Sequence, residues 1–177
     1  SAAVYPMVSD HYRIMSCGAS VGRNYGPALV SKIPLSYEFL SGKRIGVPGQ
    51  YTTAYMLMQI FTPYPFEPVF LPFDEVTEAV QTGKVDAGIL IHEGQIRAKE
   101  LGLHLVLDLG QTWFHRTQLP IPLGLDLVHR RLGNDLGKTI AKALRDAIVH
   151  SRNHEDDALD YALDFGRGID KETARQF

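Results

Sequence analysis

His92 stands at the end of a short apolar run in residues 83–94, which read GKVDAGILIHEG. The run has no polar face, as is typical of a central strand covered on both sides in a parallel sheet; its apolar members are Ala87, Ile89, Leu90 and Ile91. Ligands of open α/β sheets bind beyond the carboxyl ends of strands, so His92 is a candidate functional residue. A structural histidine whose ring nitrogens are satisfied by nearby backbone is the alternative, and the residues alone leave both open.

A second candidate site follows a predicted strand at residues 44–47. Pro48 and Gly49 form a turn, and Thr52 and Thr53 then open an apolar run that predicts a buried helix. Backbone amides at a helix N-terminus, the helix dipole and hydroxyls can together bind a carboxylate or a phosphate. Simple capping of the helix by a threonine explains the same residues, and the sequence leaves both interpretations open.

Other residues of types that can bind ligands or react are better explained by structural roles. Gly18, Gly22 and Gly26 resemble a phosphate-binding loop, but Pro27 stands where such a loop needs a lysine and a hydroxyl. No motif surrounds Cys17, which favours a small core residue over a nucleophile. These residues therefore contribute no candidate site.

Two further features also favour structural explanations. His150 and His154 are four residues apart, but Asn153 and an expected helix break between them argue against a metal site. Trp113 is better explained by packing than by stacking on a ligand.

Composition excludes several classes of partner. The 177 residues are 45% hydrophobic and 21% charged, which is typical of a globular protein. The formal net charge is −2, with 18 basic and 20 acidic residues and no block of like charge, so we expect neither nucleic acid nor a membrane surface as partner. No apolar run approaches the roughly 20 residues that span a bilayer. The single cysteine rules out an internal disulfide and fits a reducing compartment, so we expect a cytoplasmic protein.

Strand and helix patterns alternate through the first two thirds of the chain. This order predicts an α/β fold with a mostly parallel sheet flanked by helices. Asp74 is expected to cap the N-terminus of one helix. Predicted strands cover residues 1–8, 12–15, 44–47, 67–71, 87–91 and 105–109, and predicted helices cover 75–82, 136–150 and 154–164, with another beginning after Asp170.

Two extended connectors, at residues 27–33 and 119–128, bracket one compact α/β region. Prolines in the second connector cannot donate ladder hydrogen bonds, which argues against an interior strand there. We therefore predict two lobes, the first made of residues 1–26 and 127–177 and the second of residues 27–126. The cleft between them is the expected ligand site, faced by His92 and the predicted helix start at Thr52.

Three segments resemble the 1,4-dihydroxy-6-naphthoate synthase family of the futalosine route to menaquinone. They read GVPGQYTTAYMLMQIF, FDEVTEAVQTGKVDAGILIHEG and DLGQTWFHRTQLPIPLG. The resemblance implies the two-lobed fold of type 2 periplasmic binding proteins. It also implies a lyase that converts cyclic de-hypoxanthine futalosine to 1,4-dihydroxy-6-naphthoate and releases a three-carbon fragment.

The resemblance also implies residue roles. His92 would accept the proton, Thr53 and Ala54 would hold a carboxylate-bearing substrate next to Thr52, and Ser1 in the opening strand would contact the same ligand. Neither a metal nor an organic cofactor is implied. The family's opening segment, with a Ser-Pro-Cys-Pro-Asn-Asp type motif, and its closing segment have no counterpart in this sequence. We therefore expect a fragment of a longer protein with an incomplete first lobe.

A second function remains open from the sequence. A non-catalytic solute-binding protein of the same fold, taking a small carboxylate ligand, would use the same helix N-terminus. A secretory leader in the gene and recovery of the ligand unchanged would distinguish it from the lyase.

Overall fold

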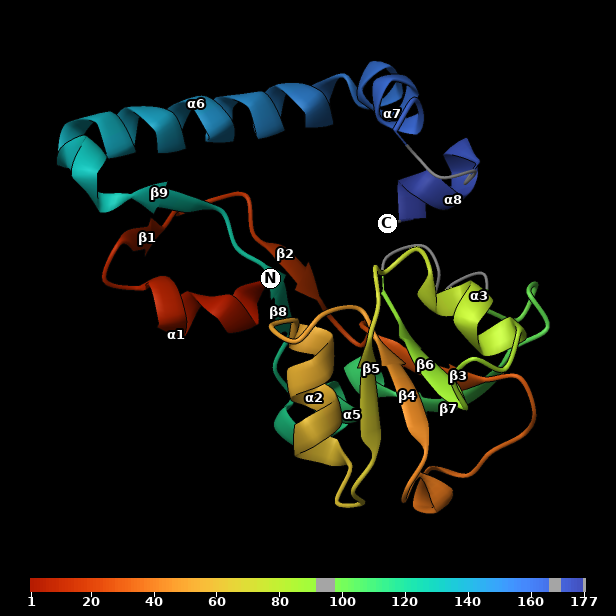
Figure 1. The fold of residues 1–177 in the computed structure, drawn as a ribbon. Coiled ribbons are helices and arrows are strands. Elements are labelled where there is room, and N and C mark those ends of the chain that lie inside the picture. The colour runs from red at the N-terminus through yellow and green to blue at the C-terminus, as the bar shows by residue number, and fades with distance from the viewer. Residues whose placement is uncertain (92–97, 166–169, 177) are drawn as a thin grey trace. The chain divides into compact units, whose positions relative to one another are not determined.

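The structure of the chain is a computed structural model that describes residues 1–91, 98–165 and 170–176. These residues form two compact units, each described by itself below (Figure 1). The first unit contains Ser1–Met7 and Ser20–Gly124, and the second contains Val8–Ala19 and Leu125–Phe177. The predicted division into lobes at residues 26/27 and 126/127 stays a prediction.

A five-stranded sheet forms the centre of the first unit (Figure 1). Its order is β5 (Glu67–Phe70), β4 (Arg44–Val47), β6 (Ala87–Leu90), β3 (Ala28–Ser31) and β7 (His104–Asp108). β4 pairs in parallel with β5 and β6, whereas β3 runs antiparallel to both β6 and β7. The sheet is therefore mixed, with the expected parallel strands along one side.

β3 corrects one expectation, because residues 27–33 were expected to form a connector. Instead, all four residues of Ala28–Ser31 are buried and pair with neighbours on both sides. A short apolar run gives no sign of which strands it pairs with, because that pairing is fixed by contacts far along the chain.

Helices cover both faces of this sheet. α2 (Thr53–Phe61) and Leu109 of α5 (Leu109–Thr117) share one buried cluster with Leu29 and Ile89. α3 (Val76–Gln81) packs into a second cluster with the next residues along the strands, Val30 and Leu90. Successive strand residues point to opposite faces, so the two clusters lie on opposite sides of the sheet. Trp113 packs against the first cluster, as expected.

The other four strands described form two short two-stranded ribbons. β2 (Ser20–Gly22) pairs antiparallel with β8 (Ile121–Gly124) in the first unit, and β1 (Tyr12–Ile14) pairs antiparallel with β9 (Leu127–His129) in the second. Pro122 lies in β8, within a two-stranded ribbon and not in a sheet interior, as its missing amide requires.

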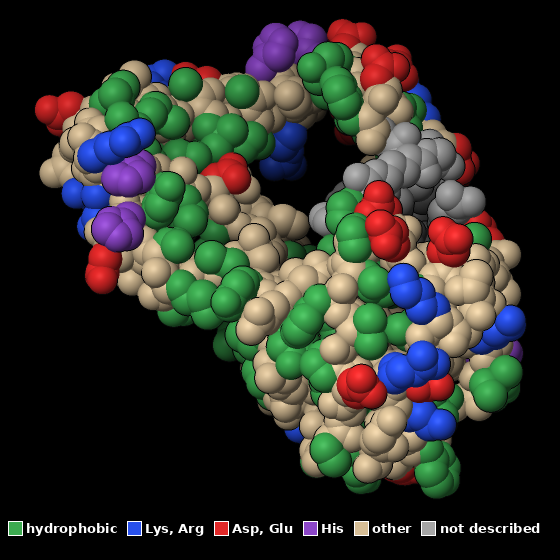
Figure 2. All heavy atoms as spheres, viewed as in Figure 1, with side chains coloured by type: hydrophobic (Ala, Val, Ile, Leu, Met, Phe, Trp, Pro, Cys, Tyr) green, Lys and Arg blue, Asp and Glu red, His purple; other side chains and the backbone are tan. Residues whose placement is uncertain are grey.

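The second unit consists of the β1–β9 ribbon and helices. After a short 3-10 turn, η3 (Arg130–Leu132), come α6 (Gly133–Asn153), α7 (Glu155–Leu163) and α8 (Lys171–Gln176). Figure 2 shows hydrophobic side chains at the surface of α6, where Leu136, Ile148 and Val149 are exposed. Among its described residues, this unit has no fully buried side chain, so its helices pack without a closed core.

The opening segment corrects a second expectation. Residues 1–8 were predicted as a strand but form a 3-10 turn, η1 (Ala2–Val4), and a short helix, α1 (Tyr5–Val8). Pro6 is tolerated there because the first turn of a helix needs no amide bond at that position. Another 3-10 turn, η2 (Tyr37–Phe39), precedes β4. Asp74 is also not the expected cap, because α3 begins at Val76 with Glu75 before it.

Candidate functional site

The N-terminus of α2 is built by the turn that follows β4. Gly49 takes a φ of +129°, a conformation open to glycine. The Thr52 hydroxyl donates to the Gly49 carbonyl at 2.8 Å and accepts from the Tyr55 amide at 3.2 Å. Thr52 is therefore a helix cap, one of the two roles that the sequence left open.

Ser1, the first residue of the sequence, also contacts the start of α2. The Thr53 amide donates to the Ser1 hydroxyl at 2.8 Å, and the two hydroxyls lie 2.9 Å apart in a hydrogen bond. The Ala3 amide also donates to the Thr53 hydroxyl, at 3.4 Å. The structure thus brings together Ser1, Thr52 and Thr53, although Ser1 precedes a 3-10 turn and not the predicted strand.

Thr53 and Ala54 are both buried, with exposed fractions of 3% and 2%. In the part of the chain that the structure describes, the Thr53 amide has Ser1 as acceptor, whereas the Ala54 amide has no hydrogen-bond acceptor. An unpaired amide at a helix N-terminus carries partial positive charge. The arrangement is chemically suited to one carboxylate oxygen at Ala54, next to the hydroxyl pair.

The sheet register places three strand ends at one edge. Ala28 pairs with Leu90 of β6 on one side and with Asp108 of β7 on the other. β4 runs parallel to β6 with Gly46 opposite Gly88, so the turn before α2 follows the same edge. His92, the predicted base, lies outside the described residues, and its role stays a prediction.

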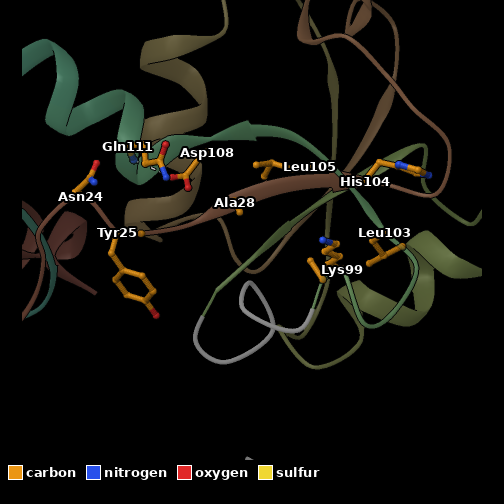
Figure 3. A pocket seen from close by; sticks show the side chains of 11 residues that line it. Asn24, Tyr25, Ala28, Lys99, Leu103, His104, Leu105, Asp108 and Gln111 are labelled. Atoms are coloured by element: carbon orange, nitrogen blue, oxygen red, sulfur yellow. Dashed lines mark hydrogen bonds between the residues drawn. The ribbon is translucent and has the colours of Figure 1, made fainter. Parts of the chain in front are cut away.

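A pocket of about 480 Å³ lies along β3 and β7 in the first unit (Figure 3). Asn24, Tyr25, Asp108 and Gln111 line one end. Ala28, Leu103 and Leu105 contribute apolar surface, and Lys99 and His104 lie toward the other end (Figure 3). The volume falls in the range of small-molecule sites.

Asp108 links the pocket to the start of α5. Its carboxylate accepts from the Gln111 amide at 2.8 Å, and its carbonyl accepts from the Thr112 hydroxyl at 2.6 Å. Burial raises the pKa of Asp108 above its ordinary value of 3.8, against the opposing effects of amide hydrogen bonds from Gln111 and Gly110 and of His115. Asp108 was not predicted from the sequence as a site residue. Its signal was an aspartate between an apolar strand and a helix, in LVLDLG.

A close backbone contact fixes the polar end of the pocket. A Cβ added at Gly110 would lie 2.2 Å from the Gly26 nitrogen and 2.4 Å from the Tyr25 carbonyl carbon. Only glycine permits this approach, so the start of α5 packs directly on the chain at Tyr25. Asn24 holds a left-handed φ of +56° just before it.

The other candidates behave as structural groups. Cys17 is half-buried and donates to the Ala141 carbonyl at 3.3 Å. The rings of His150 and His154 stack with centroids 4.2 Å apart, and His154 forms a hydrogen bond to the His150 carbonyl. Within residues 1–91, 98–165 and 170–176, no three histidine, cysteine or acidic side chains gather where they could hold a metal. No helix in the same ranges combines the length and the apolar character needed to cross a bilayer.

Comparison with known proteins identifies a family. Residues 1–177 match the protein family described as menaquinone biosynthesis. The chain is 39% identical over 161 residues to the 1,4-dihydroxy-6-naphthoate synthase of Thermus thermophilus and 33% identical over 181 residues to that of Streptomyces coelicolor. These alignments cover 91% and 99% of this chain, but 58% and 64% of the two relatives. The chain therefore spans less than two thirds of their length.

Solved structures confirm the predicted fold class. A crystal structure from Archaeoglobus fulgidus matches all of this chain and 66% of its own, with a TM-score of 0.93 and 45% identity. The alkanesulfonate-binding protein of Xanthomonas axonopodis pv. citri matches with a TM-score of 0.71 at 14% identity, over 98% of this chain and 62% of its own. The periplasmic aliphatic sulphonate-binding protein of Escherichia coli gives 0.65 at 15% identity, with the same coverages. The last two likenesses show a fold like that of periplasmic binding proteins.

Proposed function

The chain belongs to the 1,4-dihydroxy-6-naphthoate synthase family of menaquinone biosynthesis, and we propose that it acts in that pathway as a carbon–carbon lyase. The proposed reaction converts cyclic de-hypoxanthine futalosine to 1,4-dihydroxy-6-naphthoate and releases a three-carbon fragment. The family membership and the names of the two relatives support this proposal. The substrate is a small carboxylate, and no metal or organic cofactor takes part.

The start of α2 is the proposed carboxylate clamp. The observation that supports it most directly is the hydrogen-bonded pair of Ser1 and Thr53 hydroxyls beside the Ala54 amide, which has no acceptor among the described residues. A carboxylate placed there gains the amide hydrogen bond and the favourable end of the helix dipole. Thr52 holds the turn in shape, and Ser1 orients Thr53, so both prepare the site for the ligand.

His92 is the proposed general base. β6 ends at Leu90, at the sheet edge that β4 also reaches before α2, and His92 follows two residues later in the sequence. A positioned base typically contributes about 10²- to 10⁴-fold to a rate. Formation of an aromatic product supplies the driving force, so a base and an anion clamp suffice for the proposed chemistry.

We place this activity in the cytoplasm, where a chain with a single cysteine fits the reducing conditions. Nucleic acid is not a proposed partner, because the net charge is −2.

Turnover of the cyclic substrate tests the proposal. The protein is incubated with cyclic de-hypoxanthine futalosine, and the naphthoate chromophore and the three-carbon product are followed together. His92→Asn should lower the rate by about 10²-fold or more, whereas His150→Asn on the exposed end of α6 should leave it unchanged. Unaltered rates in His92→Asn would remove this base from the mechanism. A ligand that binds and is recovered unchanged would instead favour the solute-binding alternative.

A further inference from the structure

The pocket along β3 and β7 lies on the face of the sheet opposite to α2. Ala28 of β3 lines the pocket. The next two residues of the strand point in different directions, because Leu29 packs in one cluster with α2 and Val30 packs in the other with α3. Alternate residues of a strand share a face, so Ala28 points to the α3 side with Val30. A ligand in this pocket is therefore separate from one held at the start of α2.

The pocket has groups of opposite charge at its two ends. Asp108 is the last residue of β7, and Lys99 precedes the strand in a turn where the Gly102 amide donates to the Lys99 carbonyl at 3.1 Å. Figure 3 shows Leu105 between these two side chains. From His104 to Asp108 the strand extends about 13 Å at the usual rise of about 3.3 Å per residue. A carboxylate and an ammonium group thus line opposite ends of one elongated pocket.

Both charged groups are available to a ligand. Among the described residues, neither Asp108 nor Lys99 forms an ion pair. The Asp108 carboxylate accepts from the Gln111 amide at 2.8 Å, but an ionised carboxylate has about four acceptor positions. It can therefore also accept hydrogen bonds from a ligand, and the Lys99 ammonium group has donors for a ligand anion.

Electrostatics favours a cation beside Asp108. Burial raises the pKa of this carboxyl, and hydrogen bonds from the Gln111 and Gly110 amides act in the opposite direction. The negative charge is therefore poorly solvated in the unliganded protein. An ammonium group of a ligand would replace the missing solvation through charge-assisted hydrogen bonds, which are stronger than those between neutral groups.

The surface between the two charges is apolar. Ala28 and Leu103 line it and are buried, whereas Leu105 lines it and is 61% exposed. A strand leucine with this exposure has apolar surface that a ligand can cover, and covering it is favourable. The middle of the pocket therefore suits a hydrocarbon segment.

We propose that this pocket is a second small-molecule site, for a zwitterion whose ammonium and carboxylate groups are separated by an apolar chain. The ammonium group binds Asp108, the carboxylate binds Lys99, and the chain lies on Leu105. The proposal goes beyond the lyase, because the occupant is a different molecule from the proposed substrate and binds on the other face of the sheet.

Binding of matched probes tests the proposal. The dissociation constants of 6-aminohexanoate, hexylamine and hexanoate are measured by calorimetry or NMR titration. The three molecules share one chain length, but hexylamine lacks the carboxylate and hexanoate lacks the ammonium group. In the unaltered protein 6-aminohexanoate should bind about tenfold more tightly than either.

Two charge-removing variants assign each end of the probe. Asp108→Asn keeps the helix cap and removes the negative charge, so 6-aminohexanoate should lose its advantage over hexanoate. Lys99→Gln removes the positive charge, so 6-aminohexanoate should lose its advantage over hexylamine. Asp74→Asn and Lys84→Gln are the matched controls, because both residues are exposed and lie outside the pocket, and they should change neither comparison.

Amide chemical shifts locate the bound probe. Addition of 6-aminohexanoate should move the amide signals of Leu105 and Gln111 and leave those of Thr53 and Ala54 in place. Shifts confined to Thr53 and Ala54 would place the probe's carboxylate at the start of α2 and overturn the proposal.

A further pair of variants tests the apolar wall. Leu105→Trp fills the pocket and should weaken 6-aminohexanoate binding by about tenfold or more. Ile33→Trp, at a residue that is 68% exposed and outside the pocket, should not weaken it. Melting temperatures of all variants separate binding effects from lost folding.

The outcomes for this site and for the lyase are independent. Failure of 6-aminohexanoate to bind, or binding no tighter than that of hexylamine and hexanoate, would overturn the second site whatever the turnover of the cyclic substrate. Charge advantages that survive in both Asp108→Asn and Lys99→Gln would overturn it as well. Absence of turnover together with the expected probe binding would overturn the lyase and support the second site.

Discussion

The hydroxyl of Ser1 accepts a hydrogen bond of 2.8 Å from the amide of Thr53, 52 residues further along the chain. An amide in the first turn of a helix has no acceptor within the helix, so Ser1 supplies one that local sequence does not. The same hydroxyl bonds to the side chain of Thr53. Capping and the proposed carboxylate binding therefore involve the same residues at this helix start.

Ser1→Ala should destabilise the first unit. The substitution leaves the buried Thr53 amide without its acceptor, which typically costs about 1–2 kcal/mol. Urea unfolding of the two proteins measures the loss of free energy. Ser36→Ala is the matched control, because the Ser36 hydroxyl bonds an exposed glutamate at 2.9 Å and should matter little. Equal stability of Ser1→Ala and the unaltered protein would contradict the capping role.

Thr53→Val should weaken substrate binding more than it slows the chemical step. Valine matches the shape of threonine but removes the hydroxyl that pairs with Ser1. If the proposed clamp holds the carboxylate equally before and during reaction, KM rises by about tenfold while kcat changes little. Steady-state kinetics with the cyclic substrate separates the two constants. A loss confined to kcat would place this hydroxyl at the reacting atoms and not at the clamp.

Sequence patterns predicted the local elements of the sheet well. β4 and the start of α2 occur where the apolar strand, the Pro-Gly turn and the two threonines placed them, because each of these signals acts within a few residues. The predictions for β3 and for residues 1–8 were wrong because the structure of both segments depends on distant partners. Ala28–Ser31 is a strand because β6 and β7 flank it, and residues 1–8 turn where Ser1 meets Thr53.

The candidate site could be predicted only in part for the same reason. Thr52 and Thr53 followed from their position before a helix, whereas Ser1 was named through family resemblance and no spacing indicates its contact. Asp108 was not predicted as a site residue because an aspartate before a helix usually only caps it. The pocket beside it is lined by residues between 24 and 111, which are far apart in the sequence. His92 stays a prediction from the sequence.

The raised pKa of Asp108 predicts a pH effect on stability. Because the folded state holds this proton more tightly than the unfolded chain does, ionisation opposes folding. The cost is absent below the ordinary pKa of 3.8, grows as the pH rises above that value, and is constant above the folded pKa. Asp108→Asn keeps the helix cap and does not titrate. The stability of the unaltered protein relative to Asp108→Asn should therefore fall as the pH rises through this window.

Urea unfolding of both proteins from below pH 3.8 to neutral pH measures this difference. Other carboxyl groups titrate in both proteins, so their effects cancel in the comparison. A difference that is constant with pH, or that favours the aspartate as the pH rises, would contradict the burial of this carboxyl.

Gly110→Ala and Gly137→Ala should change stability in opposite directions, although both glycines lie in helices. A Cβ at Gly110 would press on the backbone of Tyr25 and Gly26, which cannot move like the end of a side chain, so we expect a loss of about 1–3 kcal/mol or more. At Gly137 in α6 the nearest atom would be a Val128 methyl at 3.8 Å, an ordinary contact. Alanine there should add about 0.5–1 kcal/mol, because it forms helices better than glycine. Thermal and urea unfolding of both variants would show the contrast, and a Gly110→Ala protein as stable as the parent would mean that the polar end of the pocket is looser than its geometry indicates.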